Sequence, residues 1–427
     1  MNNKFTLPYG KTSLTFELKS KWNPVLILPK QIHANEDAEF LVDYAIRNPL
    51  LNCGLPPLVA DSTKVVITIN DKTRPVPNDL LFPPLLRELH RIGVKNANIT
   101  FLIATGTHVP MQENEFHLLI NKNIVSQYRI LSHDCDDESN LVFKGISHFS
   151  TNIYVNKVFD DADIKIVVGD IEPHHFAGFS GGAKSAAIGV CGRNTINQNH
   201  SLLLDPRCFV GNYENNPLRQ DIEEIGALIG VDLALNAILN EQKVIVKVFF
   251  GKPLDVIKEG VKVIRKKAFI KIDHKFDLVI ASAGGYPKDI NLYQAQKALT
   301  HASLFCKNGG TVILAAACNE GVGSQSYSKF MEGVNSHQQA IDKFTKTGFS
   351  VGPHKAFQFA MIAKRVKFRL FSEIEPSTLE KLLIKPVSMM EHDIKSLLSN
   401  LSEDTRIAVI PYATATIPVI KGDSDGN

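Results

Sequence analysis

The chain is 427 residues long, with 44% hydrophobic and 21% charged residues, so it holds enough apolar material for more than one hydrophobic core. This composition excludes a disordered protein, a collagen and a disulfide-stabilised miniprotein. The formal net charge of +3 is too small and too evenly spread to favour a nucleic acid as the main partner.

The longest uncharged apolar run covers residues 311–318 and is far shorter than the roughly 18–20 residues of a membrane-spanning helix. The first residues alternate polar and apolar side chains and lack the apolar core of a signal peptide. We therefore expect a cytoplasmic protein with no membrane partner. The six cysteines form no C-x-x-C pair, which argues against a zinc knuckle and a disulfide framework.

Three predicted strands in the first half of the chain each run into a loop that is dense in Gly, Pro, His or charged residues. Residues 64–70 (KVVITIN) precede DKTRPVPN and a predicted helix over 79–92, and residues 98–104 precede TGTHVP. Residues 164–168 precede a segment rich in Gly and His, of which residues 181–190 are predicted to be helical. Because ligands bind at the carboxyl ends of strands in open α/β sheets, we expect the three loops to meet at one site.

The second half of the chain repeats this alternation. A predicted hairpin over 233–250 is followed by a basic amphipathic helix that ends near residue 267. Further strands, with helices between them, are predicted over residues 276–281, 311–318 and 406–412.

Short β-branched runs that alternate with helical patterns are typical of βαβ units. We therefore predict an α/β fold of two domains, each with a mainly parallel sheet flanked by helices, and an active site in the cleft between them. The boundary is expected near residue 270, which gives an N-terminal domain of residues 1–269 and a C-terminal domain of residues 270–427. The last apolar stretch, residues 415–420, is a candidate for packing back on the N-terminal domain.

The densest segment of the chain is the glycine-rich run EPHHFAGFSGGAKSAAIGV. Gly181 and Gly182 stand where the predicted helix begins, and free backbone N–H groups there can bind an anion such as phosphate, although packing is the plainer explanation of such glycines. Lys184 follows in the first turn. The run is not a Walker A loop, because Ala183 precedes this lysine, and a kinase or ATPase loses most of its support.

Three histidines lie near this glycine-rich turn in the predicted fold. His108 follows the second strand, His174 follows the third, and His200 comes sixteen residues after the lysine. A single histidine in such a place is more often structural, but three around one Gly-Lys turn favour chemistry. Their spacing matches no zinc motif such as H-E-x-x-H, so a hydrolytic zinc site is not indicated.

Other polar residues can hold a small acid. Arg74, at the end of the first strand, can bind a carboxylate through two hydrogen bonds, although a surface arginine is an equal alternative. Tyr293 and Lys297 are four residues apart on a predicted helix and share a face, with Gln294 beside them. That face can contact a substrate, unless it is an ordinary solvated face.

The motifs DKTRPVP, GTHVP, EPHHFAGFSGGAKSAAIGV with TINQNH, and LYQAQKAL occur in this order between about residues 60 and 300. Together they resemble the nickel-dependent lactate racemase family, whose members racemise or epimerise 2-hydroxy acids. The resemblance implies an isomerase whose N-terminal domain binds the cofactor and whose C-terminal domain closes over the substrate. It also implies transient contact with the proteins that synthesise the cofactor.

The implied cofactor is a nickel-pincer nucleotide, pyridinium-3,5-bisthiocarboxylic acid mononucleotide, joined covalently to Lys184 and with its nickel bound by His200. The resemblance makes His108 and His174 the paired acid/base residues. Further residues are implied to contact the cofactor, namely Asp71, Ser180, Gly181 and Gly182. Others are implied to hold the substrate, namely Arg74, Tyr293, Gln294 and Lys297.

The chemistry explains why such a cofactor is needed. The α-hydrogen of a 2-hydroxy acid is too weakly acidic for a histidine to remove, so it leaves as hydride while a base takes the hydroxyl proton, giving a 2-keto acid. The alternatives are a metal-assisted lyase or hydrolase, and a non-catalytic protein that binds a nucleotide or an organic acid. The missing carboxylate–histidine metal set argues against the first, and the presence of both His108 and His174 argues against the second.

Overall fold

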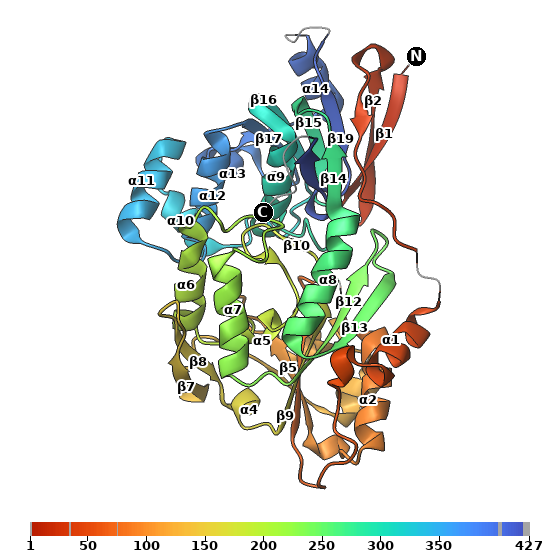
Figure 1. Ribbon diagram of the computed structural model, residues 1–427. Coiled ribbons are helices and arrows are strands. Elements are labelled where there is room, and N and C mark those ends of the chain that lie inside the picture. Colours follow the sequence, from red (N-terminus) through yellow and green to blue (C-terminus); the bar gives the residue numbers. More distant parts are fainter. Residues whose placement is uncertain (1, 34–35, 75, 400–403, 422–427) are drawn as a thin grey trace. The chain divides into compact units, whose positions relative to one another are not determined.

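A computed structural model of the chain describes all residues except 1, 34–35, 75, 400–403 and 422–427 (Figure 1). The chain divides into two compact units. One is continuous and covers residues 31–266, and the other combines residues 1–30 with residues 267–427. Within the described residues, every helix is too short or too polar to cross a membrane.

A six-stranded sheet forms the centre of the 31–266 unit. Its strand order is β13-β12-β9-β4-β5-β6, and its neighbours pair in parallel except for the antiparallel pair of β12 and β13. In chain order the strands are β4 (Val65–Asn70), β5 (Ile99–Ala104), β6 (Arg129–Ser132), β9 (Ile164–Asp170), β12 (Leu233–Leu239) and β13 (Ile245–Gly251).

The two faces of this sheet are covered differently, because successive side chains of a strand point to opposite faces. Val65, Ile67 and Ile69 of β4 belong to one core together with side chains of α1 (Ala38–Arg47) and α2 (Asn78–Arg91). The opposite face carries buried apolar side chains such as Val66 and Val167 together with the polar Thr68, and there the single turn α5 (Lys184–Ala187) packs on β4 and β9. The glycine-rich segment therefore lies on the face of the sheet opposite α1 and α2.

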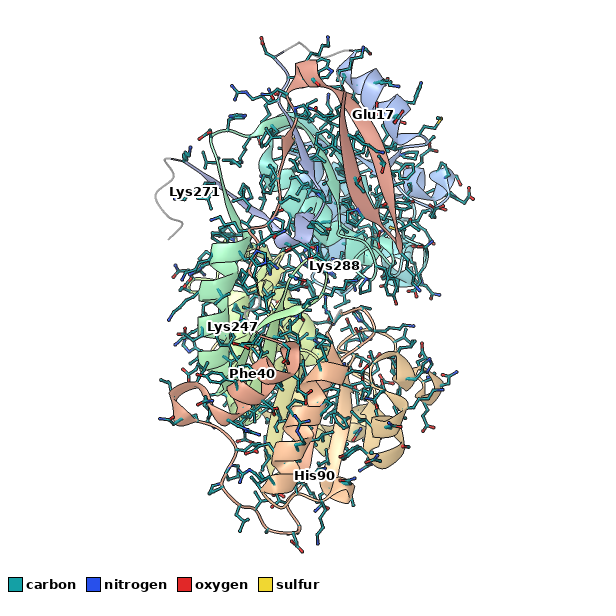
Figure 2. The ribbon with its side chains drawn as sticks, turned by 90° about the vertical axis from the view of Figure 1, so that its right-hand side faces the viewer. Glu17, Phe40, His90, Lys247, Lys271 and Lys288 are labelled. Carbon is teal, nitrogen blue, oxygen red and sulfur yellow. The ribbon has the colours of Figure 1, made fainter. Side chains whose placement is uncertain are left out.

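The last turn of α2 is held by the side chain of His90. The imidazole of His90, labelled in Figure 2, lies 2.8 Å from the carbonyl oxygen of Val94 and 2.9 Å from the hydroxyl of Tyr128. These contacts hold the turn that leads from α2 into β5. The position of that strand matters because the residues directly after it include His108.

The other unit is also built on a six-stranded sheet, and all of its strands pair in parallel, in the order β18-β17-β16-β15-β19-β3. They are β3 (Val25–Leu26), β15 (Phe276–Ser282), β16 (Cys306–Ala315), β17 (Lys367–Phe371), β18 (Lys385–Pro386) and β19 (Ile407–Ile410). Helices α9 (Leu292–Phe305) and α12 (Pro353–Ala363) share one core with β15 and β16. The α/β class and the parallel sheets predicted from the sequence are confirmed.

The N-terminal hairpin of β1 (Asn2–Tyr9) and β2 (Thr12–Lys19) packs on the second unit. Leu7 and Phe16 are buried against Leu278 and Ile313 in a common core. The domain boundaries expected from the sequence put the first residues in the N-terminal domain, whereas these apolar contacts group them with residues 267–427. The chain therefore begins in the unit of residues 1–30 and 267–427, continues through the whole of the 31–266 unit, and then completes the first unit.

The end of the chain also differs from expectation. Residues 415–420 were a candidate for packing on the N-terminal domain, but β20 (Ile417–Ile420) pairs in parallel with β14 (Phe269–Ile272). Both strands belong to the same unit. Parallel pairing with β14 therefore holds residues 417–420 within this unit.

The strands predicted over 64–70, 98–104 and 164–168 are found as β4, β5 and β9. The helix predicted over 181–190 is wrong in length, because only the turn of α5 is helical there. Gly181 and Gly182 have φ values of +85° and +60°, which a right-handed helix does not allow. A β-carbon on Gly189 would lie 2.5 Å from that of Ala104, so close packing against β5 fixes this segment.

Candidate active site

Asp71 and His108 meet at one edge of the first sheet. Asn70 at the end of β4 pairs with Ala104 at the end of β5, so the loops that follow begin side by side. Asp71 is only 5% exposed, and its Oδ2 lies 2.5 Å from Nδ1 of His108. Its Oδ1 accepts hydrogen bonds from the backbone N–H and the hydroxyl of Thr73, at 3.0 and 2.6 Å.

The charge of Asp71 decides the tautomer of His108. Burial alone would raise the pKa of the Asp71 carboxyl, but the His108 imidazole, the Arg74 guanidinium and the Thr73 hydroxyl together hold it well below its usual range. Because Asp71 is ionised, Nδ1 of His108 is the nitrogen that donates to it. The neutral ring then keeps its lone pair on Nε2, which is the atom that can accept a proton.

His174 has the opposite hydrogen-bond pattern. It ends β10 (Pro173–His174), which pairs with β11 (Gly178–Phe179), and it is 8% exposed. The backbone N–H of Ala177 donates to its Nδ1 at 3.2 Å. Nδ1 is therefore the acceptor, and the neutral ring of His174 carries its proton on Nε2.

Phe176 joins His174 to His200. Its ring meets the His174 ring edge to face with centroids 4.7 Å apart, and it meets the His200 ring in the same way at 5.1 Å. The structure thus brings the predicted acid/base residue and the predicted metal ligand to one aromatic side chain.

The orientation of His200 is set through Asn199. Nδ2 of Asn199 lies 3.1 Å from the carbonyl oxygen of Leu218 and 2.8 Å from Oδ2 of Asp221, so this nitrogen must be the amide donor. Oδ1 of Asn199 then accepts from Nδ1 of His200 at 3.0 Å. This leaves the lone pair of His200 on Nε2, an arrangement typical of histidines that bind a metal.

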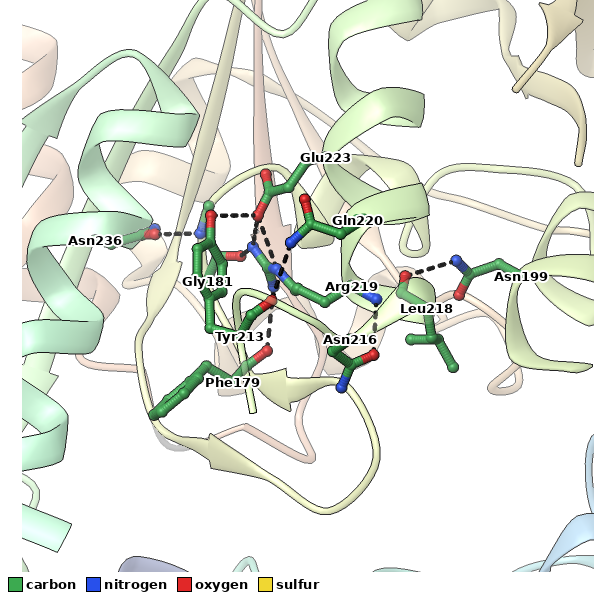
Figure 3. Close-up of polar contacts among 11 residues, drawn as sticks. Phe179, Gly181, Asn199, Tyr213, Asn216, Leu218, Arg219, Gln220, Glu223 and Asn236 are labelled. Atoms are coloured by element: carbon green, nitrogen blue, oxygen red, sulfur yellow. Dashed lines mark hydrogen bonds and ion pairs between the residues drawn. The ribbon is translucent and has the colours of Figure 1, made fainter. Parts of the chain in front are cut away.

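Arg219 holds the turn that precedes Lys184. It lies on α7 (Pro217–Leu228), is fully buried, and donates to the carbonyl oxygens of Phe179 and Gly181 at 3.1 and 3.0 Å. Figure 3 shows its guanidinium reaching these two residues beside Glu223, whose Oε1 lies 2.7 Å from Nε of Arg219. The ion pair compensates the charge of the buried guanidinium, and the remaining donors fix the turn.

The amine of Lys184 has an altered charge state. Desolvation, together with the positive charges of Arg74 and Arg219, lowers the pKa of Lys184 to about 7. An exposed lysine is almost entirely protonated at neutral pH, with a pKa of about 10.4. A large neutral fraction makes Lys184 a nucleophile, as a covalent attachment point requires.

Gly181, Gly182 and Ser180 each make close contacts within the protein. The sequence predicts that the N–H groups of this turn are free to bind an anion. The N–H of Gly182, however, donates to Oδ1 of Asn236 at 2.7 Å and is therefore already used. A β-carbon on Gly181 would lie 2.6 Å from Cγ1 of Ile171. The hydroxyl of Ser180 donates to the carbonyl oxygen of Asp170 and accepts from the N–H of Glu172. Binding of a nucleotide phosphate at this turn stays a prediction.

Tyr293, Gln294 and Lys297 lie together at the start of α9 in the other unit. The side chain of Asn291 caps this helix by accepting from the N–H of Gln294 at 3.0 Å. Nζ of Lys297 lies 2.6 Å from Oε1 of Gln294. Tyr293 and Lys297 are half-buried, whereas Gln294 is buried. They form one polar face within this unit.

Several residues in contact with this machinery were missed from the sequence. Arg219 and Lys355 lie on helices and are buried, although a charged residue in a helical pattern is usually assigned to the solvated face. Asn199 directly precedes His200, and this adjacency is the one sequence signal that could have found a partner of that histidine.

One further cluster of metal-binding residue types is found among the described residues, formed by Asp134, Cys135 and Asp136. Asp136 already pairs with Arg193, whose Nε and Nη2 lie 2.5 and 2.7 Å from its two carboxylate oxygens. Because Arg193 already binds both carboxylate oxygens of Asp136, this cluster gives little support to a metal-dependent hydrolase.

Comparison with known proteins agrees with the motifs. Residues 9–211 match the lactate racemase N-terminal domain, and residues 272–418 match the lactate racemase C-terminal domain. The lactate racemase of Lactiplantibacillus plantarum is 32% identical over 346 residues, covering 80% of this chain and 81% of the relative. The lactate racemase of Thermoanaerobacterium thermosaccharolyticum is 28% identical over 419 residues, covering 96% and 98%.

Solved structures give the same result. The lactate racemase apoprotein from Thermoanaerobacterium thermosaccharolyticum matches with a TM-score of 0.88 at 28% identity, covering 98% of this chain and all of that one. A Thermotoga maritima protein matches with a TM-score of 0.69 at 16% identity over 92% of this chain, which shows a shared fold. The chain belongs to the lactate racemase family and is an enzyme of the isomerase class.

Proposed function

We propose that this enzyme racemises or epimerises a 2-hydroxy acid of the lactate type, with His108 and His174 as the acid/base pair. The observation that carries the proposal is the opposite hydrogen bonding of the two rings. Asp71 leaves His108 with a lone pair on Nε2, and Ala177 leaves His174 with a proton on Nε2. Inversion of a hydroxyl-bearing carbon requires one proton taken and another returned, which such a pair can do.

The chain's donors fit a nickel-pincer nucleotide, pyridinium-3,5-bisthiocarboxylic acid mononucleotide. Lys184 offers an amine whose pKa is about 7, as covalent attachment requires. His200 offers the Nε2 lone pair, because Asn199 accepts from Nδ1, and imidazole suits divalent nickel. When bound, this cofactor supplies an electron-poor carbon that accepts the α-hydrogen of the substrate as hydride.

The protein residues bind the acid and move its hydroxyl proton. The guanidinium of Arg74 binds the carboxylate, and Lys297 contributes a second positive charge. Nε2 of His108 takes the hydroxyl proton, and the negative charge of Asp71 stabilises the imidazolium that forms. His174, which carries its proton on Nε2, would return a proton to the oxygen on the opposite side and so restore the hydroxyl in the inverted configuration.

The contact between the Asp71 carboxylate and His108 favours a racemase over a binding protein, and the metal-ligand residues argue against a metal-dependent lyase or hydrolase. A protein that only binds a nucleotide or an organic acid has no need of an ionised residue held 2.5 Å from the nitrogen of an imidazole. A hydrolase or lyase with its own metal would need a set of carboxylate and histidine ligands. In the part of the chain that the structure describes, the candidate is the cluster of Asp134, Cys135 and Asp136, which contains no histidine and in which Arg193 pairs with Asp136.

The proposal is tested by incubating cofactor-loaded enzyme with single enantiomers of lactate, malate, aromatic 2-hydroxy acids and sugar acids, followed by chiral chromatography. We expect at least one acid to lose its optical purity, and His108→Ala and His174→Ala each to abolish the reaction. If every acid stays enantiopure while intact-mass measurement shows a loaded Lys184, the proposed function is wrong.

A further inference from the structure

A buried imidazole connects two segments of the candidate active site. His133 directly follows β6 and is fully buried. Its Nε2 lies 3.0 Å from the carbonyl oxygen of Cys191, and its Nδ1 lies 3.1 Å from Nδ2 of Asn156. Both partners are buried as well. Each ring nitrogen of His133 therefore has a partner in the interior of the 31–266 unit.

The directions of these two hydrogen bonds fix the protonation state of His133. Oδ1 of Asn156 accepts from the backbone N–H of Val158 at 2.9 Å, so the nitrogen that faces the imidazole is the amide donor. Nδ1 of His133 must then accept, and Nε2 must carry the proton that it donates to the carbonyl oxygen of Cys191. Desolvation lowers the pKa of His133, which also favours the neutral ring.

The backbone of His133 contacts the turn that leads to His108. Its N–H donates to the carbonyl oxygen of Ile103 in β5 at 3.0 Å, and its carbonyl oxygen accepts from the hydroxyl of Thr105 at 2.6 Å. The carbonyl oxygen of Thr105 in turn accepts from the N–H of His108 at 3.0 Å. A shift of His133 would therefore move the turn that holds the proposed base.

The side chain of His133 contacts the segment that leads to His200. Cys191 lies two residues before α6 (Arg193–Ser201), the helix that carries His200. The backbone N–H of the first residue of α6 also donates to the carbonyl oxygen of Cys135, at 3.0 Å. The loop after β6 thus holds the start of this helix at two points, one of them the imidazole.

We propose that His133 is a positioning residue for His108 and His200: its neutral imidazole holds the start of α6 against the turn that follows β5. This inference rests on the proposed function, which makes one histidine an acid/base residue and the other a nickel ligand. A displacement of about 1 Å in such groups can lower a rate by about 10²-fold. A side chain that bridges the two segments therefore acts on the reaction through these two residues.

The experiment compares His133→Leu and His133→Gln with wild-type enzyme, all loaded with cofactor, at a temperature where circular dichroism shows each protein to be folded. Leucine leaves the carbonyl oxygen of Cys191 and the amide of Asn156 without their partner. For this variant we expect kcat per bound nickel to fall by about tenfold or more, with KM within about threefold of the wild type. Glutamine offers one donor and one acceptor, so it should recover most of kcat.

Nickel content gives a readout that does not depend on turnover. Intact mass measures the adduct on Lys184, and elemental analysis measures the metal. His133→Leu should carry as much adduct as the wild type but less nickel per adduct, because His200 is no longer held in place.

Asn121→Ala is the matched control for stability. Oδ1 of Asn121 caps α3 (Lys122–Gln127) in the same unit by accepting from the N–H of Ile124 at 3.1 Å. Loss of this cap should lower the urea midpoint. The variant should nonetheless keep the kcat and the nickel content of the wild type.

A measurement on the wild type tests the protonation state without any substitution, and it also applies if His133→Leu does not fold. Nuclear magnetic resonance of protein with isotope-labelled histidine, at neutral pH, should show a His133 ring that is protonated on Nε2 alone. The signals of His133 are those that His133→Gln lacks. A ring protonated on Nδ1 or on both nitrogens would overturn the inference.

Two results on the variants would overturn it as well. One is a folded His133→Leu whose kcat and nickel content are within about twofold of an active wild type. The other is an equal loss in Asn121→Ala at a similar urea midpoint, which would mean that the loss follows stability alone. A loaded wild type that converts no acid would overturn the proposed function, whereas nickel content and the protonation of His133 still test this inference.

Discussion

The carboxylate of Asp71 determines which nitrogen of His108 carries a proton. Its lowered pKa keeps it ionised at neutral pH, and Oδ2 lies 2.5 Å from Nδ1. A proton that arrives at Nε2 produces an imidazolium next to a negative charge. Asp71 was assigned to the cofactor from the sequence, but the structure shows it in contact with the proposed base.

Asp71→Asn should lower kcat by about 10²–10⁴-fold, because an amide neither stabilises the imidazolium nor fixes the tautomer. Initial rates of racemisation on loaded enzyme measure the effect. Thr73→Val is the matched control, since it removes a hydroxyl that donates to Asp71 but keeps the carboxylate. It should lose less than about tenfold. Equal losses in the two variants would contradict this role of Asp71.

The amine of Lys184 should react in a pH range where exposed lysines do not. Its pKa of about 7 means that it is protonated and unreactive below that pH and neutral above it. Labelling of cofactor-free protein with an amine-acylating reagent should therefore rise at Lys184 with a midpoint near pH 7. Exposed lysines reach their midpoint near pH 10.4. Peptide mass spectrometry of the labelled protein measures both.

Arg74→Met provides the control for this titration. The guanidinium of Arg74 disfavours a second positive charge, so its removal should raise the pKa of Lys184 and move the labelling midpoint to higher pH. A midpoint near pH 10 in the unmodified chain would show that Lys184 is an ordinary solvated lysine.

At the scale of elements, α7 supports both proposed attachment points of the cofactor. The carbonyl oxygen of Leu218 and the carboxylate of Asp221 fix the amide of Asn199, which orients His200. Arg219, between them, fixes the turn before Lys184. One rigid helix thereby positions an amine and an imidazole that lie on different segments, a geometry that loops alone would hold less accurately.

Arg219→Met should destabilise the 31–266 unit by about 3–5 kcal/mol, because it leaves Glu223 charged and largely buried. Urea denaturation measures this loss. The double variant Arg219→Met/Glu223→Gln should recover most of the stability, since no unpaired charge remains. Both variants should nonetheless attach less cofactor, as read by intact mass, because the carbonyl oxygens of Phe179 and Gly181 lose their donor. Full attachment in the stable double variant would argue against this role.

Short apolar runs were enough to predict β4, β5 and β9, because a parallel strand that is buried on both faces is a continuous apolar run of recognisable length. The loops after them were also recognisable by their Gly, His and charged residues. The length of α5 was overestimated, because Gly181 and Gly182 adopt positive φ values and Gly189 packs closely against Ala104, a residue distant in the sequence. Lys355 was missed for a similar reason, since Tyr293 and Gln296, which it contacts, lie on another helix.

At the scale of the whole molecule, the path of the chain could not be predicted from local patterns. The alternation in β1 and β2 predicts strands, but it does not say which core receives their apolar faces. The structure buries Phe5, Leu7, Phe16 and Leu18 in the core of the second unit. The 31–266 unit is continuous, whereas the other is assembled from both ends of the chain.

This arrangement predicts how fragments of the chain behave. Residues 31–266 expressed alone should show a cooperative melting transition, but residues 267–427 alone should not. Without the hairpin, the core loses four apolar side chains worth about 1.5–3 kcal/mol each, a sum comparable to the roughly 5–15 kcal/mol that stabilises a domain. Because the N–H of Lys30 donates to the carbonyl oxygen of Lys267 at 2.9 Å, residues 1–30 can be fused to residues 267–427 through a short linker. Calorimetry should show that this fusion melts cooperatively. A cooperative transition of residues 267–427 without the hairpin would mean that the hairpin is not needed for this core.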